Sequence, residues 1–363
     1  MKLKKIAAAL CAAIVGSLML SSCTDTEEGS SAPKAENSSS KVQEAEESSA
    51  PESSKSSSVE GSSQAESSFD SSSQSGADEE KASDITPAMW TITSDSGVKI
   101  TMLGSMHALK DSDYPLPSQI TDAFNSSDIL AVECDTEKSN SIAFQSALLK
   151  EMVFDDGGKL SDHISEEGLA ALDAYLKTYG MGAEMMETYK PWAVSNTVDS
   201  LPIMYSELKA DKGIDFYLLD QAKSAGKEVY EVESVDFQMD LLMNFSDEIY
   251  DLMFRSLEEE TKDTQIEALM ELHDAWASGD IDEIDRLSNE VEGDISEDDL
   301  KLVQEYSKLM ILDRNITMEN AVKELLEGDK DVFFVVGAAH YVGEGGIIDL
   351  LEKDGYTVER LEY

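Results

Sequence analysis

Two apolar segments of the chain end in the same short motif, a glycine followed three positions later by a histidine. Residues 98–103 lead into the motif that ends at His107, and residues 331–336 lead into the motif that ends at His340. Continuous runs of β-branched and aromatic residues predict strands that are buried on both faces. Open α/β folds carry their chemistry where such strands end, so we expect both histidines at one edge of a sheet.

A third apolar segment, residues 128–133, ends in Glu133. Residues 117–126 have a helical pattern and separate it from the segment before His107. Upstream, residues 89–93 precede a Ser-Asp-Ser-Gly turn, which predicts a β-hairpin with the strand that follows. Strand, helix and strand in this order indicate one right-handed βαβ unit.

The middle of the chain, residues 141–326, is mostly helical in pattern. It contains one predicted strand, residues 227–232, and amphipathic helical segments such as residues 237–253. At the C-terminus, residues 356–361 are predicted to close the sheet. The expected fold is α/β, with a mixed sheet, flanking helices and a large helical insertion, in one domain over residues 87–363.

Residues 1–22 have the composition of a bacterial lipoprotein signal peptide, with lysines, an apolar run and small residues before Cys23. In such a signal the cysteine is lipidated and becomes the first residue of the mature protein. The alternative is an ordinary signal peptide with an incidental cysteine. Residues 23–86, rich in serine and glutamate, have too few apolar side chains to fold and predict a disordered tether. We therefore expect a lipid-anchored protein on the extracellular face of the cell membrane.

The chain is strongly acidic, with 75 Asp and Glu against 28 Lys and Arg and a formal net charge of −47. This charge argues against nucleic acid as a partner and against direct adsorption to anionic lipids. Attachment to the membrane would thus depend on the lipid at Cys23. Among the cysteines, Cys134 alone lies beyond this N-terminal region, and we expect it to be a small buried residue rather than a nucleophile.

If the three strands are parallel neighbours, His107, Glu133 and His340 meet at one sheet edge. Two imidazoles and a carboxylate form a common ligand set for a divalent first-row metal ion and leave positions open for water. Such an ion would lower the pKa of a bound water and polarise a carbonyl group. The alternative interpretation is that these strand-end side chains only hydrogen-bond the turns that follow them.

The ordered set of motifs resembles the TraB/PrgY/GumN family, which includes the Tiki proteins. The resemblance covers residues 88–363 and depends on the set rather than on any one motif. The matching pieces are Leu103-Gly104-Ser105-Met106-His107, Ala131-Val132-Glu133, Lys190-Pro191-Trp192, Gly213-Ile214-Asp215, Asp313-Arg314-Asn315 and Val336-Gly337-Ala338-Ala339-His340.

This resemblance implies a core related to ChaN and the erythromycin esterases, and a metal-dependent peptidase activity. By position, it implies that His107, Glu133 and His340 hold the metal ion, with manganese, cobalt, zinc and iron as candidates. It also implies that Glu133 and Arg314 take part in catalysis, with Arg314 stabilising an anion that develops on the substrate. The alternative for Arg314 is a surface ion pair with one of the many acids.

We therefore expect a membrane-anchored extracellular metal-dependent hydrolase, a peptidase, whose substrate is a peptide or another small molecule and whose motif glycines are Gly104 and Gly337. The alternative function is a non-catalytic surface protein that binds and sequesters a small peptide. Capture of haem or iron, by analogy with ChaN, is a third hypothesis that rests on fold-level analogy. No feature of the sequence selects a substrate.

Overall fold

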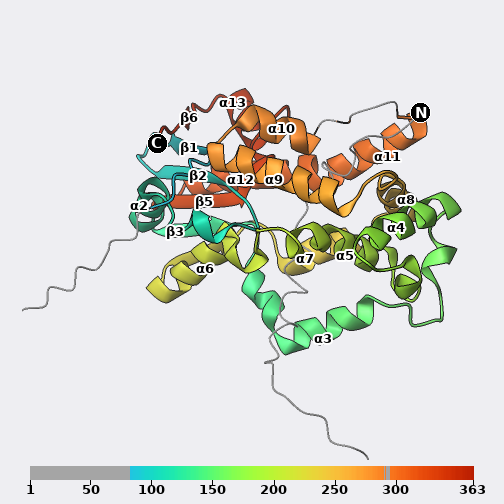
Figure 1. Cartoon of the computed structure of the whole chain (residues 1–363). Coiled ribbons are helices and arrows are strands. Elements are labelled where there is room, and N and C mark those ends of the chain that lie inside the picture. The colour runs from blue at the N-terminus through green and yellow to red at the C-terminus, as the bar shows by residue number, and fades with distance from the viewer. Residues whose placement is uncertain (1–81, 290, 292–294) are drawn as a thin grey trace, which may run out of the picture. The chain divides into compact units, whose positions relative to one another are not determined.

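A six-stranded mixed sheet holds the three predicted strand ends side by side (Figure 1). The computed structural model describes residues 82–289, 291 and 295–363. The predicted signal peptide, the predicted lipidation site Cys23 and all but the last residues of the predicted tether lie outside the described residues. In the part that is described, strands and helices alternate as expected, which confirms the α/β fold class.

The centre of the sheet is parallel and one side of it is antiparallel. The spatial order of the strands is β4-β3-β5-β2-β1-β6. The strands are β1 (Met89–Thr93), β2 (Lys99–Ser105), β3 (Ile129–Val132), β4 (Glu228–Glu231), β5 (Val332–Gly337) and β6 (Glu359–Arg360). Because β2 and β3 both pair with β5 in parallel, the carboxyl ends of all three strands meet at one edge. The predicted hairpin of β1 with β2 and the closing strand β6 are also confirmed.

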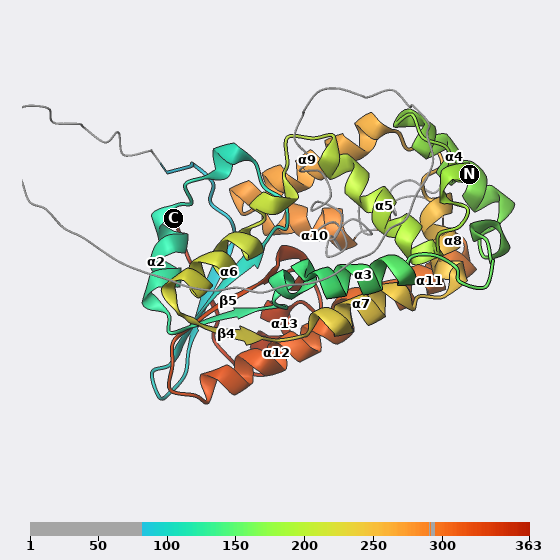
Figure 2. The ribbon, with the colours of Figure 1, turned by 90° about the horizontal axis from the view of Figure 1, so that it is seen from below.

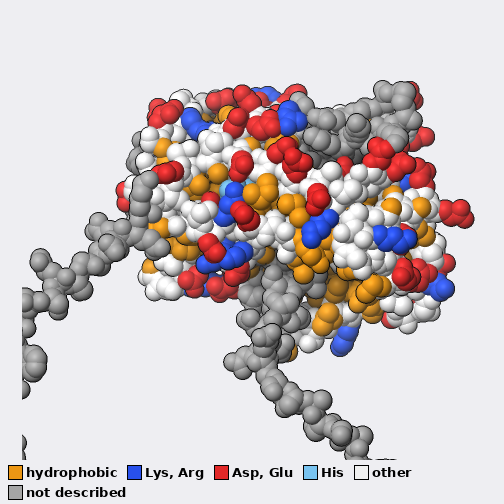
Figure 3. All heavy atoms as spheres, in the orientation of Figure 1, with side chains coloured by type: hydrophobic (Ala, Val, Ile, Leu, Met, Phe, Trp, Pro, Cys, Tyr) orange, Lys and Arg blue, Asp and Glu red, His pale blue; other side chains and the backbone are white. Residues whose placement is uncertain are grey.

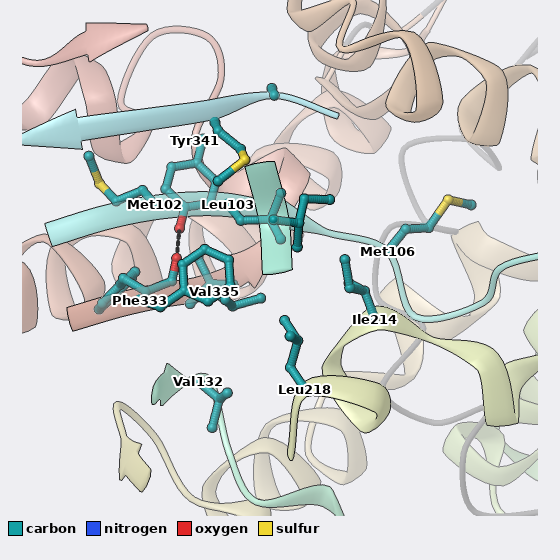
Figure 4. Packing of buried hydrophobic residues seen from close by; sticks show 14 of the residues in the cluster. Met102, Leu103, Met106, Val132, Ile214, Leu218, Phe333, Val335 and Tyr341 are labelled. Atoms are coloured by element: carbon teal, nitrogen blue, oxygen red, sulfur yellow. Dashed lines mark hydrogen bonds between the residues drawn. The ribbon is translucent and has the colours of Figure 1, made fainter. Parts of the chain in front are cut away.

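Helices cover both faces of the sheet (Figure 2). On one face lie α2 (Ser118–Ser126) and α6 (Ile214–Ala225), and on the other lie α12 (Asp313–Leu326) and α13 (Ile347–Lys353). The connection from β3 leads to the edge strand β4, and the connection from β4 leads back past β3 to β5. Because both crossovers are right-handed and run in opposite directions along the sheet, their helices lie on opposite faces. Figure 4 shows how α6 projects Ile214 and Leu218 towards β2 and β5. The Tyr341 hydroxyl donates a hydrogen bond at 3.0 Å to the backbone carbonyl of Phe334, a residue of β5.

The other helices belong to the predicted helical insertion, most of which packs around a hydrophobic core of its own that includes Leu172, Trp192 and Phe254. They are α3 (Ile142–Glu151), α4 (Glu166–Thr178), α5 (Pro191–Met204), α7 (Val235–Met243), α8 (Asp247–Arg255), α9 (Lys262–Ser278), α10 (Ile281–Asn289) and α11 (Glu297–Ser307). The buried apolar residues of α9 and α10 join the core of the sheet instead. A π-helical turn, Lys308–Leu312, joins α11 to α12.

The predicted helix over residues 237–253 is wrong in one respect, because α7 and α8 are separate helices. Apolar residues continue at helical spacing across the break, which is why the sequence pattern shows one segment. The hydroxyl of Ser246 accepts a hydrogen bond from the backbone of Ile249 and caps a new helix there. A local side-chain cap therefore overrides the continuous apolar pattern.

The surface of the described part matches the composition of the chain. In Figure 3 acidic side chains outnumber basic ones on the visible face, and apolar side chains form scattered patches between them. Within the described residues, none of the helices combines the length and the apolar character needed to cross a bilayer.

Candidate active site

The carboxyl ends of β2, β3 and β5 bring His107, Glu133 and His340 into one cluster. Glu133 and His340 are 6% and 4% exposed, and the side chain of His107 is 13% exposed. Nε2 of His340 lies 3.9 Å from Oε1 of Glu133. His107 and Glu133 are close enough for each to shift the pKa of the other. The expected convergence is therefore present, whereas the catalytic and metal-binding roles of these residues stay predictions.

Protein donors hold both oxygens of the Glu133 carboxylate. Its Oε1 accepts from the backbone N–H of Gly337 at 2.7 Å, and its Oε2 accepts from Gln238 at 3.0 Å and from Arg314 at 2.6 Å. Burial would raise the pKa of Glu133, but the Arg314 guanidinium and the nearby imidazoles outweigh it and lower the pKa to about 2. Glu133 is therefore ionised at neutral pH, which suits a metal ligand or a fixed charge better than a general base.

The guanidinium of Arg314 lies between two carboxylates. Its Nε and Nη2 donate to Glu233 at 2.9 and 3.0 Å, while Nη2 also reaches Glu133. Its Nη1 donates at 3.1 Å to the carbonyl of Met310, a residue of the π-helical turn that directly precedes α12. Only 4% of the Arg314 side chain is exposed, so this ion pair is internal. Single π turns in helices are frequent at functional sites, and here one aims an arginine at the sheet edge.

His340 is fixed in one tautomer by Asn315. The Asn315 amide donates to the carbonyl of Gly345 at 2.8 Å, so its oxygen is left to accept from Nδ1 of His340 at 2.6 Å. The lone pair of His340 Nε2 is consequently free and faces Glu133. Burial and the charge of Arg314 lower the pKa of His340 to about 3, so this imidazole is neutral at physiological pH.

His107 is oriented by the first turn of α6. Nδ1 of the His107 ring lies 2.8 Å from Oδ2 of Asp215. The other ring nitrogen, Nε2, is therefore not the one that this carboxylate binds. The backbone N–H of Ile214 donates to the Met106 carbonyl at 3.1 Å, and a Cβ on Gly213 would lie 2.3 Å from the His107 carbonyl oxygen. Only glycine therefore permits α6 to approach this closely. Burial lowers the pKa of His107, but Asp215 outweighs it, and the pKa rises to about 9.

Both motif glycines allow close packing at the sheet edge. A Cβ on Gly104 would lie 3.0 Å from Ala338, in the turn that carries the second histidine. A Cβ on Gly337 would lie 3.2 Å from Oε1 of Glu133 and 3.4 Å from the His340 ring. A side chain at either position would push the cluster apart.

Sequence reasoning missed part of this cluster, namely Asp215, Glu233, Gln238 and Asn315. Asp215 and Asn315 lie inside motifs used for the family resemblance, but neither had an assigned role. Glu233 follows β4 as Glu133 follows β3, and β3 and β4 are parallel neighbours, so the strand-end rule could have found it. Gln238 lies on α7, and no sequence signal marks it.

Cys134 is 4% exposed, as expected for a small buried residue. Its Sγ donates to Oε1 of Gln238 at 3.1 Å. Burial raises the pKa of the Cys134 thiol, and the nearby carboxylates raise it further. The thiol form is therefore favoured, and a nucleophilic thiolate is not.

The donor chemistry of the cluster suits a divalent metal ion, although the side chains are not drawn together around one. Both histidines have Nδ1 hydrogen-bonded to an oxygen acceptor, as metal-binding histidines usually do. Two carboxylates, those of Glu133 and Glu233, pair with the guanidinium of Arg314, and a third, that of Asp215, pairs with His107. Once His107 has lost its proton, three negative charges stand against one positive charge, an excess that favours a cation.

Among the residues that the structure describes, however, no three potential ligands stand at metal-binding distances from one another. The 3.9 Å between His340 Nε2 and Glu133 Oε1 exceeds the roughly 3.4 Å between two ligands of a tetrahedral ion. Binding would therefore require these two side chains to draw together.

The chain is similar to several known proteins. A sequence profile of the TraB/PrgY/gumN family matches residues 88–360. The Escherichia coli protein YbaP, described as uncharacterised, is 24% identical over 254 residues, which are 69% of this chain and 86% of YbaP. The human metalloprotease TIKI1 is 25% identical over 320 residues, which are 76% of this chain and 62% of TIKI1. The metalloprotease TIKI homolog of Nematostella vectensis is 27% identical over 216 residues, with 54% and 46% of the two chains covered.

The matched region thus spans less than two thirds of these TIKI proteins. No solved structure matches the chain, and the relation to ChaN and the erythromycin esterases stays a prediction.

Proposed function

The chain belongs to the TraB/PrgY/gumN family, and on that premise we propose that it is a metal-dependent hydrolase that cleaves peptides. Relatives named metalloproteases are 25% and 27% identical to it over the aligned regions. The observation that carries the proposal is the paired orientation of two histidines whose Nδ1 atoms are held by Asp215 and Asn315. Each imidazole can then offer Nε2 to a cation at the same edge of the sheet, and at His107 the cation would displace the proton that a pKa of about 9 retains at neutral pH.

In this proposal His107 and His340 hold the ion through Nε2, and Glu133 is the third ligand. A divalent ion bound there would supply a water of lowered pKa and polarise the carbonyl group of a substrate. Arg314 is assigned mainly to holding Glu133 in place, because all of its guanidinium nitrogens already donate to protein acceptors. The hydrogen bonds within the described structure use four of the five guanidinium N–H groups, so an anion on the substrate would meet the second N–H of Nη1 or exchange with one of these bonds.

The first test is the metal content of the full chain, purified without chelator or nickel and measured by mass spectrometry. We expect near-stoichiometric manganese, cobalt, zinc or iron in the wild-type protein, and none in a folded His107→Ala/His340→Ala double variant. His163→Ala is the matched control, because the side chain of His163 is 34% exposed and pairs with Asp247 on another part of the fold. That variant should retain the metal and cleave the same members of a peptide library.

The test also decides between this function and the alternatives. A folded wild-type chain that takes up none of these metals, even after reloading, would contradict the metallohydrolase. Peptide binding that survives in Glu133→Ala would then favour a non-catalytic protein that sequesters a peptide. A Soret band after addition of haem would favour haem capture.

We further propose that the protein is anchored to the extracellular face of the membrane through a lipid on Cys23. The support is the sequence of residues 1–23 together with the acidic charge, which opposes adsorption to anionic lipid by any other means. Cys23→Ser should move the protein from the membrane to the soluble fraction and abolish incorporation of labelled fatty acid. Unchanged fractionation of this variant would contradict the anchor.

A further inference from the structure

The hydroxyl of Ser105 is buried at the end of β2 without a protein partner. Ser105 is 4% exposed, and its Oγ has no hydrogen-bond acceptor or donor among the residues that the structure describes. Leaving a buried hydroxyl unpaired costs the free energy of removing it from water, and most such groups in folded proteins bind protein or ordered water. A small molecule beside Ser105 would remove this cost.

The register of the sheet shows which way this hydroxyl faces. Ser105 of β2 lies opposite Gly337 of β5 in a parallel pair, and residues opposite each other project from the same face. The direction of a Cβ on Gly337 is known, because that atom would lie 3.2 Å from Oε1 of Glu133 and 3.4 Å from the His340 ring. Ser105 therefore projects from the face that holds the candidate active site. The strand that carries Ser105 and the strand that carries Gly337 are about 4.8 Å apart.

The glycine opposite Ser105 leaves room on this face. Gly337 has no side chain, and the backbone N–H of Gly337 already donates to Glu133. Nε2 of His340 and Oε1 of Glu133 stand 3.9 Å apart, too far for a direct hydrogen bond. A hydroxyl, a carboxylate oxygen and an imidazole lone pair thus lie on one face of the same sheet edge, and together they offer a donor and two acceptors.

We propose that Ser105 Oγ, Glu133 Oε1 and His340 Nε2 bind one water molecule at the end of β2. The Ser105 hydroxyl donates to the water oxygen, and the two hydrogens of the water point to the carboxylate and the imidazole. In the metal-dependent reaction proposed above, on which this second statement rests, an ion held by Glu133 and His340 would displace this water, and the Ser105 hydroxyl would donate instead to the water that the ion supplies for attack on the substrate. Ser105 is then a catalytic residue that binds the nucleophile, which no motif-based argument assigns.

Two variants of nearly equal shape isolate the hydroxyl. Ser105→Thr keeps the hydroxyl, whereas Ser105→Val replaces it by a methyl group of similar size. If either variant folds poorly, Ser105→Ala removes the hydroxyl with no added bulk. The matched control is Ser288→Ala, because Ser288 on α10 is also a buried serine, 5% exposed, whose Oγ has no partner in the described structure. It lines a different, mostly apolar cavity with Ile249 and Tyr306.

The first readout is a high-resolution crystal structure of the full chain, treated with a chelator so that it is free of metal. We expect an ordered water within hydrogen-bond distance of Ser105 Oγ and of Glu133 or His340 in the wild-type and Thr proteins, and no water there in the Val protein. A wild-type Ser105 hydroxyl that donates instead to a backbone carbonyl, or an empty place beside it, would overturn the proposal.

The second readout is peptide cleavage by the metal-loaded chain. We expect Ser105→Val to lower kcat about tenfold or more relative to Ser105→Thr, with a similar KM and metal content, and Ser288→Ala to match the wild type. Equal kcat values for Val and Thr would refute the catalytic role. If even the wild type cleaves nothing, the hydrolase proposal fails, while the crystal structure still decides whether Ser105 binds the water.

Discussion

Nη2 of Arg314 lies 2.6 Å from Oε2 of Glu133, and both side chains are almost completely buried. Glu233 binds the same guanidinium through its Nε and Nη2. A buried ion pair adds little net stability compared with an apolar pair, but removing one partner leaves the others as uncompensated charges. The candidate active site is therefore also a place where single substitutions threaten the fold.

Arg314→Ala should lower the free energy of unfolding by about 3–5 kcal/mol, because it leaves Glu133 and Glu233 buried without their counter-charge. Urea unfolding followed by circular dichroism measures this loss. Lys301→Ala is the control, since Lys301 and its partner Asp298 are 70% and 92% exposed. Its effect should stay below about 1 kcal/mol. Equal losses in the two variants would show that Arg314 is not required to neutralise the cluster.

The sequence predicts the parts of this site that follow from strand ends. Glu133 comes directly after an apolar run, His107 and His340 each end a Gly-x-x-His motif that follows one, and parallel pairing of β2, β3 and β5 brings such ends together. The sheet order was predictable to this extent because long apolar runs are buried strands whatever surrounds them. The break between α7 and α8 was not, because it depends on one capping hydroxyl.

The partners that orient these side chains could not be predicted in the same way. Asp215, Glu233 and Asn315 lie far from the histidines and from Glu133 in sequence, and acidic residues are so frequent in this chain that each one carries little information. Gln238 reaches the site only because α7 starts directly after β4. These contacts depend on how helices pack on the sheet, which periodicity does not encode.

Asp215→Asn should weaken metal binding by about 10- to 100-fold while the fold is retained. The reason is that the Asp215 carboxylate orients the His107 imidazole, and this imidazole is the group that would bind the ion. Competition with a chromogenic chelator measures the affinity. The control is Asp247→Asn, which removes the carboxylate partner of the remote His163 and should leave the affinity unchanged. An unchanged affinity in Asp215→Asn would mean that His107 does not bind the ion.

Gly213→Ala should destabilise the protein by about 2 kcal/mol or more, since its Cβ would lie 2.3 Å from the His107 carbonyl oxygen and force α6 away from β2. Gly226→Ala, at the other end of α6, provides the comparison. Gly226 has φ 66° and open space around it, so only backbone strain of about 1 kcal/mol is expected there. Thermal or urea unfolding of the two variants measures the difference. A smaller loss in Gly213→Ala than in Gly226→Ala would contradict the close approach.

Asp199 on α5 should make the protein less stable as the pH rises. Burial raises the pKa of this carboxyl to about 7, whereas an aspartate in an unfolded chain titrates near pH 4. Between these values the unfolded chain releases the proton first, so the free energy of unfolding falls from about pH 4 to about pH 7 and then stays level. Below about pH 4 the group is protonated in both states and has no effect.

Asp199→Asn removes this penalty, so the variant should be more stable than the wild type by about 1–3 kcal/mol at pH 8 and equally stable at pH 4. The gain stays below the value set by the full pKa difference because the side chain is only partly buried and solvent screens its charge. Urea unfolding at both pH values measures it, with Asp122→Asn on the exposed side of α2 as the control. A gain of the same size at pH 4 would mean that the substitution acts through packing or helix propensity. Because Asp199 lies outside the Glu133 cluster, the gain should come without any change in metal content.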